Sequence, residues 1–390
     1  MTIQQTVGIA QKYQYVETLP IVTALGPSKN QIVREPIGVV AAITPWNFPL
    51  VLAMWKIAPA LAMGNSIVLK PASNTPLGSL KLAELAVEAG IPPGVFNVIT
   101  GPGSSVGEAL VTHKEIDKVA FTGSTEVGRK IMELASGTVK KVTLELGGKA
   151  PAIVLPDADL ELAIPGILLG VFFHSGQVCE SGTRLLVHES IYEEVIQKLA
   201  ATSSTIKLGN PLDPSTGMGP LISKQQMETV LSYIESGLNE GARLVCGGKR
   251  ASGPEVDNGY YIEPTIFADV TNDMKIAREE IFGPVLSVIK YSTEEEAIEI
   301  ANDTIYGLSG GIWSRDVVKA NKIASKIKAG TIWINDWHMF RVDAPFGGYK
   351  QSSLGRELGT NVLDEYTEVK HIHTSLTNEN NQRPALGLLF

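Results

Sequence analysis

The sequence is poor in cysteine and has no excess of positive charge. Only Cys179 and Cys246 occur among 390 residues. Two cysteines are too few for a disulfide framework, so a reducing compartment is expected. Lysine and arginine number 33 against 41 acidic residues, which gives a net charge of −8. This balance favours neither nucleic acid nor an anionic membrane as a partner. The six histidines are scattered without the spacing of a zinc site, and no metal is expected.

The sequence also lacks the pattern of a signal peptide, so the cytoplasm is the expected location. One segment, residues 37–55, is uncharged and long enough to cross a bilayer. Pro45 and Pro49 interrupt it, and Lys56 follows directly. Because two prolines four residues apart break both a helix and a strand, this segment is not expected to span a membrane. We expect a buried strand at 37–43, then a turn, then a helix that starts near Pro49.

Hydrophobic residues make up 44% of the chain and charged residues 19%, as in an ordinary globular protein. The length predicts two domains and leaves room for an extra arm. From 37 to 147, short β-rich runs alternate with helical patterns, which is typical of a parallel, doubly wound sheet. Thr75 and Pro76 are expected to start one of these helices, with Thr75 as the N-cap. The expected strands are 37–43, 66–69, 95–99, 118–121 and 141–144, and the expected helices are 76–90, a helix through 110, and 125–135.

A second set of elements runs from 150 to about 350 and predicts a second α/β domain. Its expected strands are 151–155, 184–188, 243–246, 285–291 and 331–335, and its expected helices are 191–201, 224–239 and 317–328. Segments 13–24, 31–34 and 367–376 resemble isolated strands that no local partner completes. Exposed strands of this kind usually pair with another subunit or another domain.

Two motifs carry possible chemistry. Cys179 follows Gly176-Gln177-Val178 among small and polar residues. It is either a nucleophile that needs activation or a small buried apolar side chain, the more common fate of a free cysteine. The strand-to-helix turn at 121–128, Phe-Thr-Gly-Ser-Thr-Glu-Val-Gly, suits a dinucleotide phosphate at a helix N-terminus. Its two glycines alone indicate a tight turn equally well.

Seven blocks together resemble the aldehyde dehydrogenase superfamily, in order and in spacing. They are 43–49, 68–71, 121–128, 144–149, 176–184, 279–284 and 345–350, and the resemblance runs from Arg34 onward. It implies an α/β fold with a Rossmann-type NAD(P)-binding domain at 37–147 and a catalytic domain at 148–350. The oligomerisation arm would comprise a hairpin within 1–36 and a strand within 351–390. The strand near 368–374 is similar to the family's intersubunit strand, so a homodimer or homotetramer is expected.

The resemblance implies a covalent mechanism. Cys179 matches the family nucleophile, whose thiolate attacks the aldehyde carbon, and Asn47 matches the amide that stabilises the oxyanion. Glu145 matches the general base that activates water to release the acid. Glu357 is kept as a proton relay, whereas Ser353 replaces a common glycine in the block around it and is expected to alter a turn.

The resemblance also implies a cofactor site for NAD. Many relatives place a glutamate that binds the ribose 2′-hydroxyl at the position of Ser73. A carboxylate there would repel a 2′-phosphate, whereas Ser73 beside Lys70 would accept one, so NADP is the alternative coenzyme. A lysine or glutamate is more often a surface charge, and only its block makes it a candidate. The candidate cofactor-binding residues are Thr44, Trp46, Lys70, Ser73, Gly123, Ser124, Glu280 and Phe282.

A small-molecule aldehyde is the expected substrate, bound in an aromatic-walled funnel. Glu180 is unusual directly after the nucleophile. With Trp337 and Asp343 it would favour a cationic aldehyde such as betaine aldehyde, but a solvated carboxylate beside a generic tunnel is the preferred interpretation. The candidate substrate residues are Phe48, Trp55, Phe173, Glu180, Phe340 and Phe346.

Two other functions stay open. A CoA-acylating relative would replace water by CoA, but that branch does not need Glu145 as a base. A catalytically silent structural or binding homologue is the third reading. The chain begins late relative to most of the family, which suggests a short or truncated member with apolar surface exposed and with activity that cannot be assumed.

Overall fold

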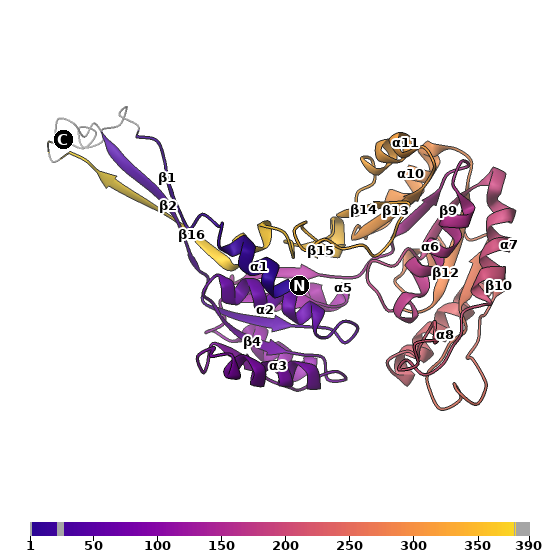
Figure 1. Cartoon of the computed structure of the whole chain (residues 1–390), viewed down its shortest axis with the longest axis horizontal. Helices are drawn as coiled ribbons and strands as arrows, with labels where there is room; N and C mark the ends of the chain where they lie inside the picture. The colour runs from indigo at the N-terminus through magenta and orange to yellow at the C-terminus, as the bar shows by residue number, and fades with distance from the viewer. Residues whose placement is uncertain (1, 22–26, 378, 380–390) are drawn as a thin grey trace.

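The computed structural model describes residues 2–21, 27–377 and 379. Three β-sheets follow one another along the long axis of the molecule (Figure 1). A three-stranded arm lies at one end, a six-stranded sheet in the middle and a seven-stranded sheet at the other end. Within the described residues, no helix is both long and apolar enough to cross a membrane.

The six-stranded sheet has the order β15-β7-β6-β3-β4-β5. Its neighbouring strands are parallel except for β15, which runs antiparallel to β7. Alternation along β3 decides which helix covers which face, because successive side chains of a strand point to opposite sides. Val40 and Ala42 face α2 and α3, whereas Ala41 and Ile43 face α4 and α5. The elements are β3 (Val39–Ile43), α2 (Val51–Ala62), β4 (Ser66–Lys70), α3 (Leu77–Glu88), β5 (Phe96–Val98), a π-turn at Gly103–Gly107, α4 (Glu108–Thr112), β6 (Lys118–Thr122), α5 (Thr125–Ser136), β7 (Lys141–Glu145) and β15 (Ser353–Leu354).

The seven-stranded sheet has the order β10-β11-β12-β9-β8-β13-β14, and only β10 is antiparallel to its neighbour. Helices α6 and α7 pack on one face, and α8 to α11 pack on the other. The elements are β8 (Pro151–Val154), α6 (Leu160–Phe172), β9 (Arg184–His188), α7 (Tyr192–Ser203), α8 (Lys224–Asn239), β10 (Arg243–Cys246), β11 (Thr265–Ala268), α9 (Lys275–Arg278), β12 (Val285–Tyr291), α10 (Glu294–Asn302), β13 (Ser309–Trp313), α11 (Val317–Ala324) and β14 (Thr331–Ile334).

The arm agrees with one expectation and corrects another. Strands β1 (Val16–Thr18) and β2 (Ser28–Pro36) pair antiparallel, as expected of a hairpin within 1–36. Strand β16 (Thr367–Ser375) is not isolated, because it pairs antiparallel with β2 within this chain. The partner of β2 lies at the opposite end of the sequence, so no local pattern could identify it. Part of the expected strand 13–24 falls at 22–26, outside the described residues.

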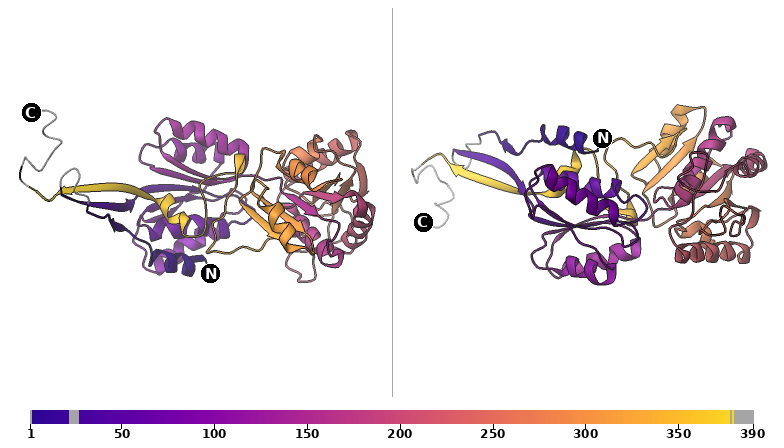
Figure 2. Two further views of the ribbon diagram at one scale, coloured as in Figure 1. Left: turned by 90° about the horizontal axis from the view of Figure 1, so that it is seen from above. Right: turned by 60° about the horizontal axis from the view of Figure 1, so that its bottom comes forward.

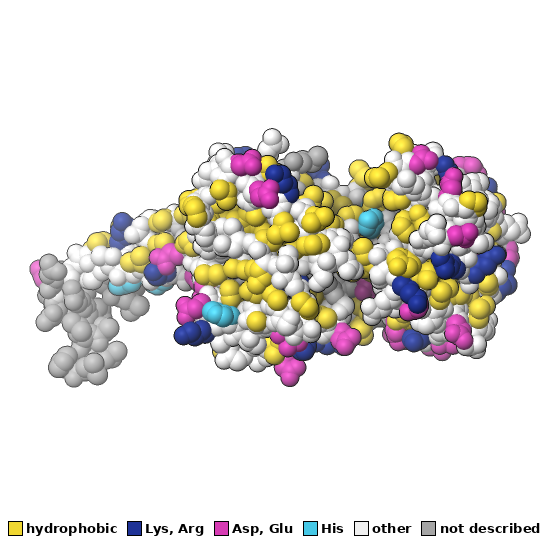
Figure 3. Space-filling view, turned by 90° about the horizontal axis from the view of Figure 1, so that it is seen from below, with side chains coloured by type: hydrophobic (Ala, Val, Ile, Leu, Met, Phe, Trp, Pro, Cys, Tyr) yellow, Lys and Arg dark blue, Asp and Glu magenta, His cyan; other side chains and the backbone are white. Residues whose placement is uncertain are grey.

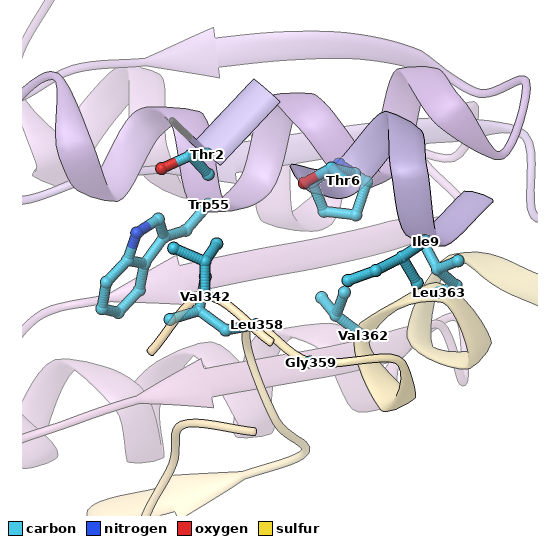
Figure 4. Close-up of a pocket in the computed structure, with 10 residues that line it drawn as sticks. Thr2, Thr6, Ile9, Trp55, Val342, Leu358, Gly359, Val362 and Leu363 are labelled. Atoms are coloured by element: carbon cyan, nitrogen blue, oxygen red, sulfur yellow. The ribbon is translucent and has the colours of Figure 1, made fainter. Parts of the chain in front are cut away.

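The N-terminal helix α1 (Thr2–Ala10) was not expected. It packs across α2 and the segment after β15, where Thr6 faces Trp55, Leu358 and Val362 around a small gap of about 10 Å³ (Figure 4). A second correction concerns α3, whose N-cap is Pro76 without a side-chain cap. The hydroxyl of Thr75 is buried and has no hydrogen-bond partner among the described residues, so Thr75 does not cap this helix.

An apolar face of α3 is exposed to solvent. Leu77 is 78% exposed and Val87 is 60% exposed, and Leu85 lies between them on the same helix. Hydrophobic side chains are spread over this side of the six-stranded unit (Figure 3). The helix expected over 76–90 is confirmed as α3, in which Leu82, Ala83 and Ala86 pack against the core while other apolar side chains are exposed.

Arg184 ties the start of β9 to distant segments of the seven-stranded unit. Its side chain is fully buried at the start of β9. The guanidinium donates to the carbonyls of Lys149, Ile300 and Ala301 and to Asn272 Oδ1, all within 3.0 Å. Four donated hydrogen bonds compensate for the burial of this charge.

We therefore expect Arg184→Met to lower the free energy of unfolding by about 3–5 kcal/mol, because three buried carbonyls lose their donor. Arg243 is the matched control: it pairs with Asp269 and Glu193 in solvent, and Arg243→Met should cost about 1 kcal/mol or less. Urea denaturation measures both. Equal losses in the two variants would contradict the role given to Arg184.

Candidate active site

A cavity of about 300 Å³ lies between the two larger sheets. One wall comes from the loops that follow β3, β6 and β7, at the carboxyl edge of the six-stranded sheet. The other wall comes from Cys179 before β9, the segment 280–282 before β12, and α8. Crevices at the carboxyl ends of parallel strands are the usual ligand sites of such sheets.

Cys179 lies in a loop whose backbone is held in unusual conformations. After α6, His174 and Ser175 have φ values of 52° and 59°, which residues other than glycine rarely adopt. Gly176 has a φ of 72°, and a Cβ there would lie 2.2 Å from the carbonyl oxygen of Gly283. Only glycine therefore allows this loop to pack against the segment before β12.

The Cys179 thiol donates to Glu180 Oε2 over 3.3 Å. Burial raises the pKa of Cys179 well above its usual range, and the negative charges of Glu180, Glu280 and Glu145 raise it further. The thiol is therefore neutral at rest and must lose its proton before it can act as a nucleophile.

Asn47 lines the same cavity as Cys179. Its Nδ2 donates to the carbonyl oxygen of Gln177 over 2.9 Å. Its Oδ1 is buried and has no hydrogen-bond partner in the described structure. Gln177 is itself fixed, because its side chain donates to the His174 carbonyl and accepts from the Ile222 amide. The amide of Asn47 is thus tied to the Cys179 loop, two residues before the cysteine.

Glu145 ends β7 and is buried. Its Oε1 accepts a hydrogen bond from Ser353 Oγ over 2.7 Å, and its Oε2 has no partner in the described structure. Burial raises the pKa of Glu145 well above its usual range, and the charge of Glu357 adds to this effect, whereas the Ser353 hydroxyl lowers it. Ser353 does not merely alter a turn: it pairs opposite Glu145 in the sheet.

Lys56 holds Glu357 near Glu145, whose pKa both charges affect, and was not singled out from the sequence. Its Nζ forms a short ion pair with Glu357 Oε1 and donates to Thr122 Oγ1 over 2.6 Å. The signal was available, since Lys56 is the only charged residue in α2, whose other residues are apolar. A lysine that is fully buried in this way needs a partner.

Five of the candidate cofactor residues, Trp46, Gly123, Ser124, Glu280 and Phe282, line the cavity. Trp46 and Phe282 meet edge to face with ring centroids 5.3 Å apart, one from each wall. Ser124 caps α5 by accepting from the amide of Val127. The N-terminus of this twelve-residue helix therefore opens onto the cavity, where it favours a negative charge.

Glu280 faces the backbone that follows β7. Its Oε1 accepts from the amide of Gly148 over 3.1 Å, and burial raises its pKa to about 7. Lys149 is also buried, its Nζ has no partner in the described structure, and burial lowers its pKa to about 7.

The other three candidate cofactor residues do not line this cavity. The amide of Thr44 donates to the carbonyl of Lys70, which joins the ends of β3 and β4. Lys70 Nζ donates to the Pro71 carbonyl, and burial lowers the pKa of Lys70. Ser73 Oγ donates to the carbonyl of Gly101 in the next loop.

The aromatic candidate substrate residues form a wall beside Cys179. Cys179 and Phe48 pack against Trp55 and Phe346, and Trp55 also contacts Phe340. Phe48 continues this wall through a stack on Phe173, with centroids 6.3 Å apart.

Glu180 differs from the expectation of a solvated carboxylate, because it is only 4% exposed. Its Oε1 lies 2.9 Å from Nδ1 of His338, a residue that was not singled out from the sequence. The two other groups expected near Glu180 do not add to a cation site. Trp337 is buried and donates to the Glu180 carbonyl, and Asp343 is paired with Arg341.

Helix α8 contributes residues that sequence reasoning missed. Gln226, Thr229 and Tyr233 line the cavity. Gln226 Nε2 donates to the carbonyls of Ile281 and Phe282. This contact holds Phe282 at a φ of 56°, a conformation that surrounding structure must enforce. No sequence motif marks Gln226, Thr229 and Tyr233, because α8 lies far along the chain from the other residues that line the cavity.

Comparison with known proteins adds independent findings. A model of the aldehyde dehydrogenase family matches residues 1–372. A betaine aldehyde dehydrogenase of Bacillus subtilis (strain 168) is 52% identical over 372 residues, which are 94% of this chain and 76% of that protein. Human aldehyde dehydrogenase 1A1 is 48% identical over 97% of this chain and 74% of its own length. A crystal structure of betaine aldehyde dehydrogenase from Staphylococcus aureus in complex with NAD+ matches with a TM-score of 0.94 and 45% identity, covering 97% of this chain and 75% of that one.

The raised pKa of Glu280 predicts a pH-dependent loss of stability. An unfolded glutamate titrates near pH 4.3, so the stability associated with protonated Glu280 is present below that pH and is lost as the pH rises to about 7. Glutamine does not titrate. The free energy of unfolding of the wild type should therefore fall relative to Glu280→Gln by up to about 3 kcal/mol between pH 4 and 8. Urea titrations measure this difference. Glu279→Gln, the same change at an exposed neighbour, is the control, and an equal pH trend there would contradict the assignment.

Proposed function

Because the chain belongs to the aldehyde dehydrogenase family, we propose that it oxidises an aldehyde to its carboxylic acid with NAD, through a covalent intermediate on Cys179. One observation carries this proposal. The partly buried thiol of Cys179 and the Asn47 amide line the same cavity as the N-terminus of α5, at the edge where two sheets meet.

The residues around the cavity fit NAD. The N-terminus of α5 at Gly123 and Ser124 suits the pyrophosphate. The Glu280 carboxylate suits hydroxyl groups of a ribose, and Lys70 and Ser73 mark the end expected to hold the adenosine. One relative, the betaine aldehyde dehydrogenase of Staphylococcus aureus, was crystallised with NAD+ in several structures, which supports NAD over NADP. Bound NAD supplies the acceptor for the hydride of the substrate.

In the first half of the reaction, the Cys179 sulfur attacks the aldehyde carbon and forms a C–S bond. The carbonyl oxygen becomes an oxyanion, which accepts hydrogen bonds from Asn47 Nδ2 and the backbone N–H of Cys179. One such donor is worth about 3–4 kcal/mol in comparable sites. Loss of hydride from the same carbon leaves a thioester on Cys179.

In the second half, Glu145 takes a proton from water, the water oxygen attacks the thioester carbon, and the C–S bond breaks. The unpartnered Oε2 of Glu145 is the oxygen available to the water, since Oε1 is occupied by Ser353. Burial and the charge of Glu357 raise the pKa of Glu145, which makes this carboxylate a stronger base. The buried pair of Glu357 and Lys56 provides the route by which the proton leaves.

We assign a separate role to the part of the chain that forms each sheet. In this proposal, residues 37–147 bind the coenzyme and residues 148–350 carry the nucleophile. The arm, with segments in 1–36 and 351–390, joins copies of the chain into a homodimer or homotetramer. The position of β16 at the edge of the arm supports this role, because its outer side is exposed and open to pairing.

The substrate is proposed to be a small aldehyde that reaches Cys179 along the aromatic wall. Several relatives are named betaine aldehyde dehydrogenase, so betaine aldehyde belongs in the first panel with acetaldehyde and benzaldehyde. The burial of Glu180 weakens the idea that its charge faces a cationic substrate directly.

The proposal predicts that Cys179→Ala abolishes turnover, because no nucleophile remains to form the thioester. Production of NADH and NADPH at 340 nm with the aldehyde panel measures it. Cys246 is the matched control, since it lies on β10 in the seven-stranded sheet and Cys246→Ala should retain activity. Turnover that persists in Cys179→Ala would refute the covalent route.

The hydrogen bond from Ser353 to Glu145 leads to a prediction for the pH profile of thioester hydrolysis. Its hydroxyl stabilises the ionised form of Glu145, so Ser353→Gly should raise the pKa of that carboxyl. A hydrogen bond to a charged group is worth about 1.5–3 kcal/mol, and one pH unit corresponds to 1.36 kcal/mol. The acidic limb of the kcat profile should move up by about one pH unit. Ser353→Thr retains the hydroxyl and should not move the limb; a common profile for all three proteins would exclude this role.

A further inference from the structure

Glu180 connects the nucleophile to a histidine. Its Oε2 accepts from Cys179 Sγ over 3.3 Å, and its Oε1 lies 2.9 Å from His338 Nδ1. The backbone of Glu180 is fixed as well, since its carbonyl accepts from Trp337 Nε1 and from Ser309 Oγ. The carboxylate is therefore held between the thiol and the imidazole, away from water.

His338 is placed by its surroundings to serve this carboxylate. Its side chain is 9% exposed, its ring lies 5.2 Å from that of Phe173, and its φ of 60° is left-handed. Nε2 is buried and has no partner in the described structure. With a hydrogen on Nδ1, the ring donates to Glu180 Oε1 and holds that carboxylate oxygen in place.

The charge of Glu180 alone works against a nucleophile. Three carboxylates face the thiol: Glu180 from its own loop, Glu280 from the segment before β12, and Glu145 from the end of β7. All three raise the pKa of Cys179. Only Glu180 also makes a hydrogen bond with the sulfur. A carboxylate in contact with the thiol has a second option, which is to accept its proton.

We propose that Glu180 is the general base that deprotonates Cys179, and that His338 is the positioning residue that holds Glu180 for this transfer. The S–H bond breaks, its electron pair stays on sulfur, and the proton moves to Oε2. The carboxylate becomes a neutral carboxylic acid while the sulfur becomes a thiolate. The net charge of the site is therefore unchanged when the sulfur attacks. When the thioester is hydrolysed and the thiolate leaves, Glu180 returns the proton.

This inference rests on the proposed role of Cys179, but it can be tested without coenzyme or aldehyde. In a Cys246→Ala background, the rate at which iodoacetamide alkylates Cys179 reports formation of the reactive thiolate between pH 6 and 9. A result here is independent of turnover, so failure of this inference leaves the proposed oxidation intact, and loss of the oxidation would appear in the Cys179→Ala assay instead.

The two roles of Glu180 predict opposite signs. If Glu180 is the base, Glu180→Gln should slow alkylation at pH 7 by about tenfold or more. General-base catalysis contributes about 10²-fold or more to a complete enzyme reaction, and alkylation tests only the deprotonation of the thiol. If Glu180 acts only through its charge, Glu180→Gln should speed alkylation. Glu280→Gln is the matched control, because it removes a charge that faces the same sulfur without contact and should speed alkylation under either role. A faster or unchanged rate in Glu180→Gln overturns the proposal.

His338 is tested by rescue. His338→Phe keeps an aromatic ring beside Phe173 but removes the donor, and should slow alkylation. His338→Asn restores an N–H donor and tolerates a left-handed backbone, and should recover much of the rate. Thermal unfolding checks that each variant is folded. Glu180→Asp covers the case in which Glu180→Gln fails to fold, because it keeps the charge but shortens the reach to sulfur. It should also slow alkylation, and a wild-type rate in Glu180→Asp overturns the proposal.

Discussion

The structure depends on the burial of ionisable groups where the two larger sheets meet. Lys56, Glu357 and Glu145 lie on one side of this junction, and Arg184 and Glu180 lie on the other, all with little or no exposure to solvent. Removing such charges from water costs several kcal/mol each unless partners replace the lost hydration. The partners are present for most of them, as the ion pair of Lys56 with Glu357 and the four hydrogen bonds of Arg184 illustrate.

The same burial shifts the pKa values of groups that could take part in a reaction. A group whose lost hydration is not fully replaced by partners has a shifted pKa. Burial raises the pKa values of Cys179, Glu145 and Glu280, and neighbouring negative charges raise those of Cys179 and Glu145 further. The burial that costs stability at the junction thus raises the pKa of these carboxyl groups, that of Glu280 to about 7. Figure 2 shows in two further views where the six-stranded unit meets the seven-stranded unit.

Much of this arrangement could be predicted from sequence because it rests on local patterns. The alternation of strands and helices is confirmed in both larger sheets, and β9, β10, β12 and α8 begin and end where expected. The placement of Cys179, Asn47 and five cofactor candidates around one cavity also follows from loops at strand ends. These features depend on short segments whose hydrophobic period and glycines can be read directly.

The rest depends on contacts between distant segments. The pairing of β2 with β16 joins residues more than 300 positions apart, and Ser353 reaches Glu145 only through β15. The burial of Glu180 arises from Trp337 and His338, on a loop about 160 residues away. α6 was missed because its apolar residues surround the whole helix and Pro165 interrupts it, so no amphipathic period is visible.

The most direct test of the central claim is to trap the covalent intermediate. Glu145→Gln removes the proposed base for water, so the thioester should accumulate when this variant is mixed with NAD and benzaldehyde. Peptide mass spectrometry after rapid acid quench should then find a benzoyl group on the peptide that contains Cys179, and none on the peptide that contains Cys246. Full turnover by Glu145→Gln without any acyl group on Cys179 would contradict the account.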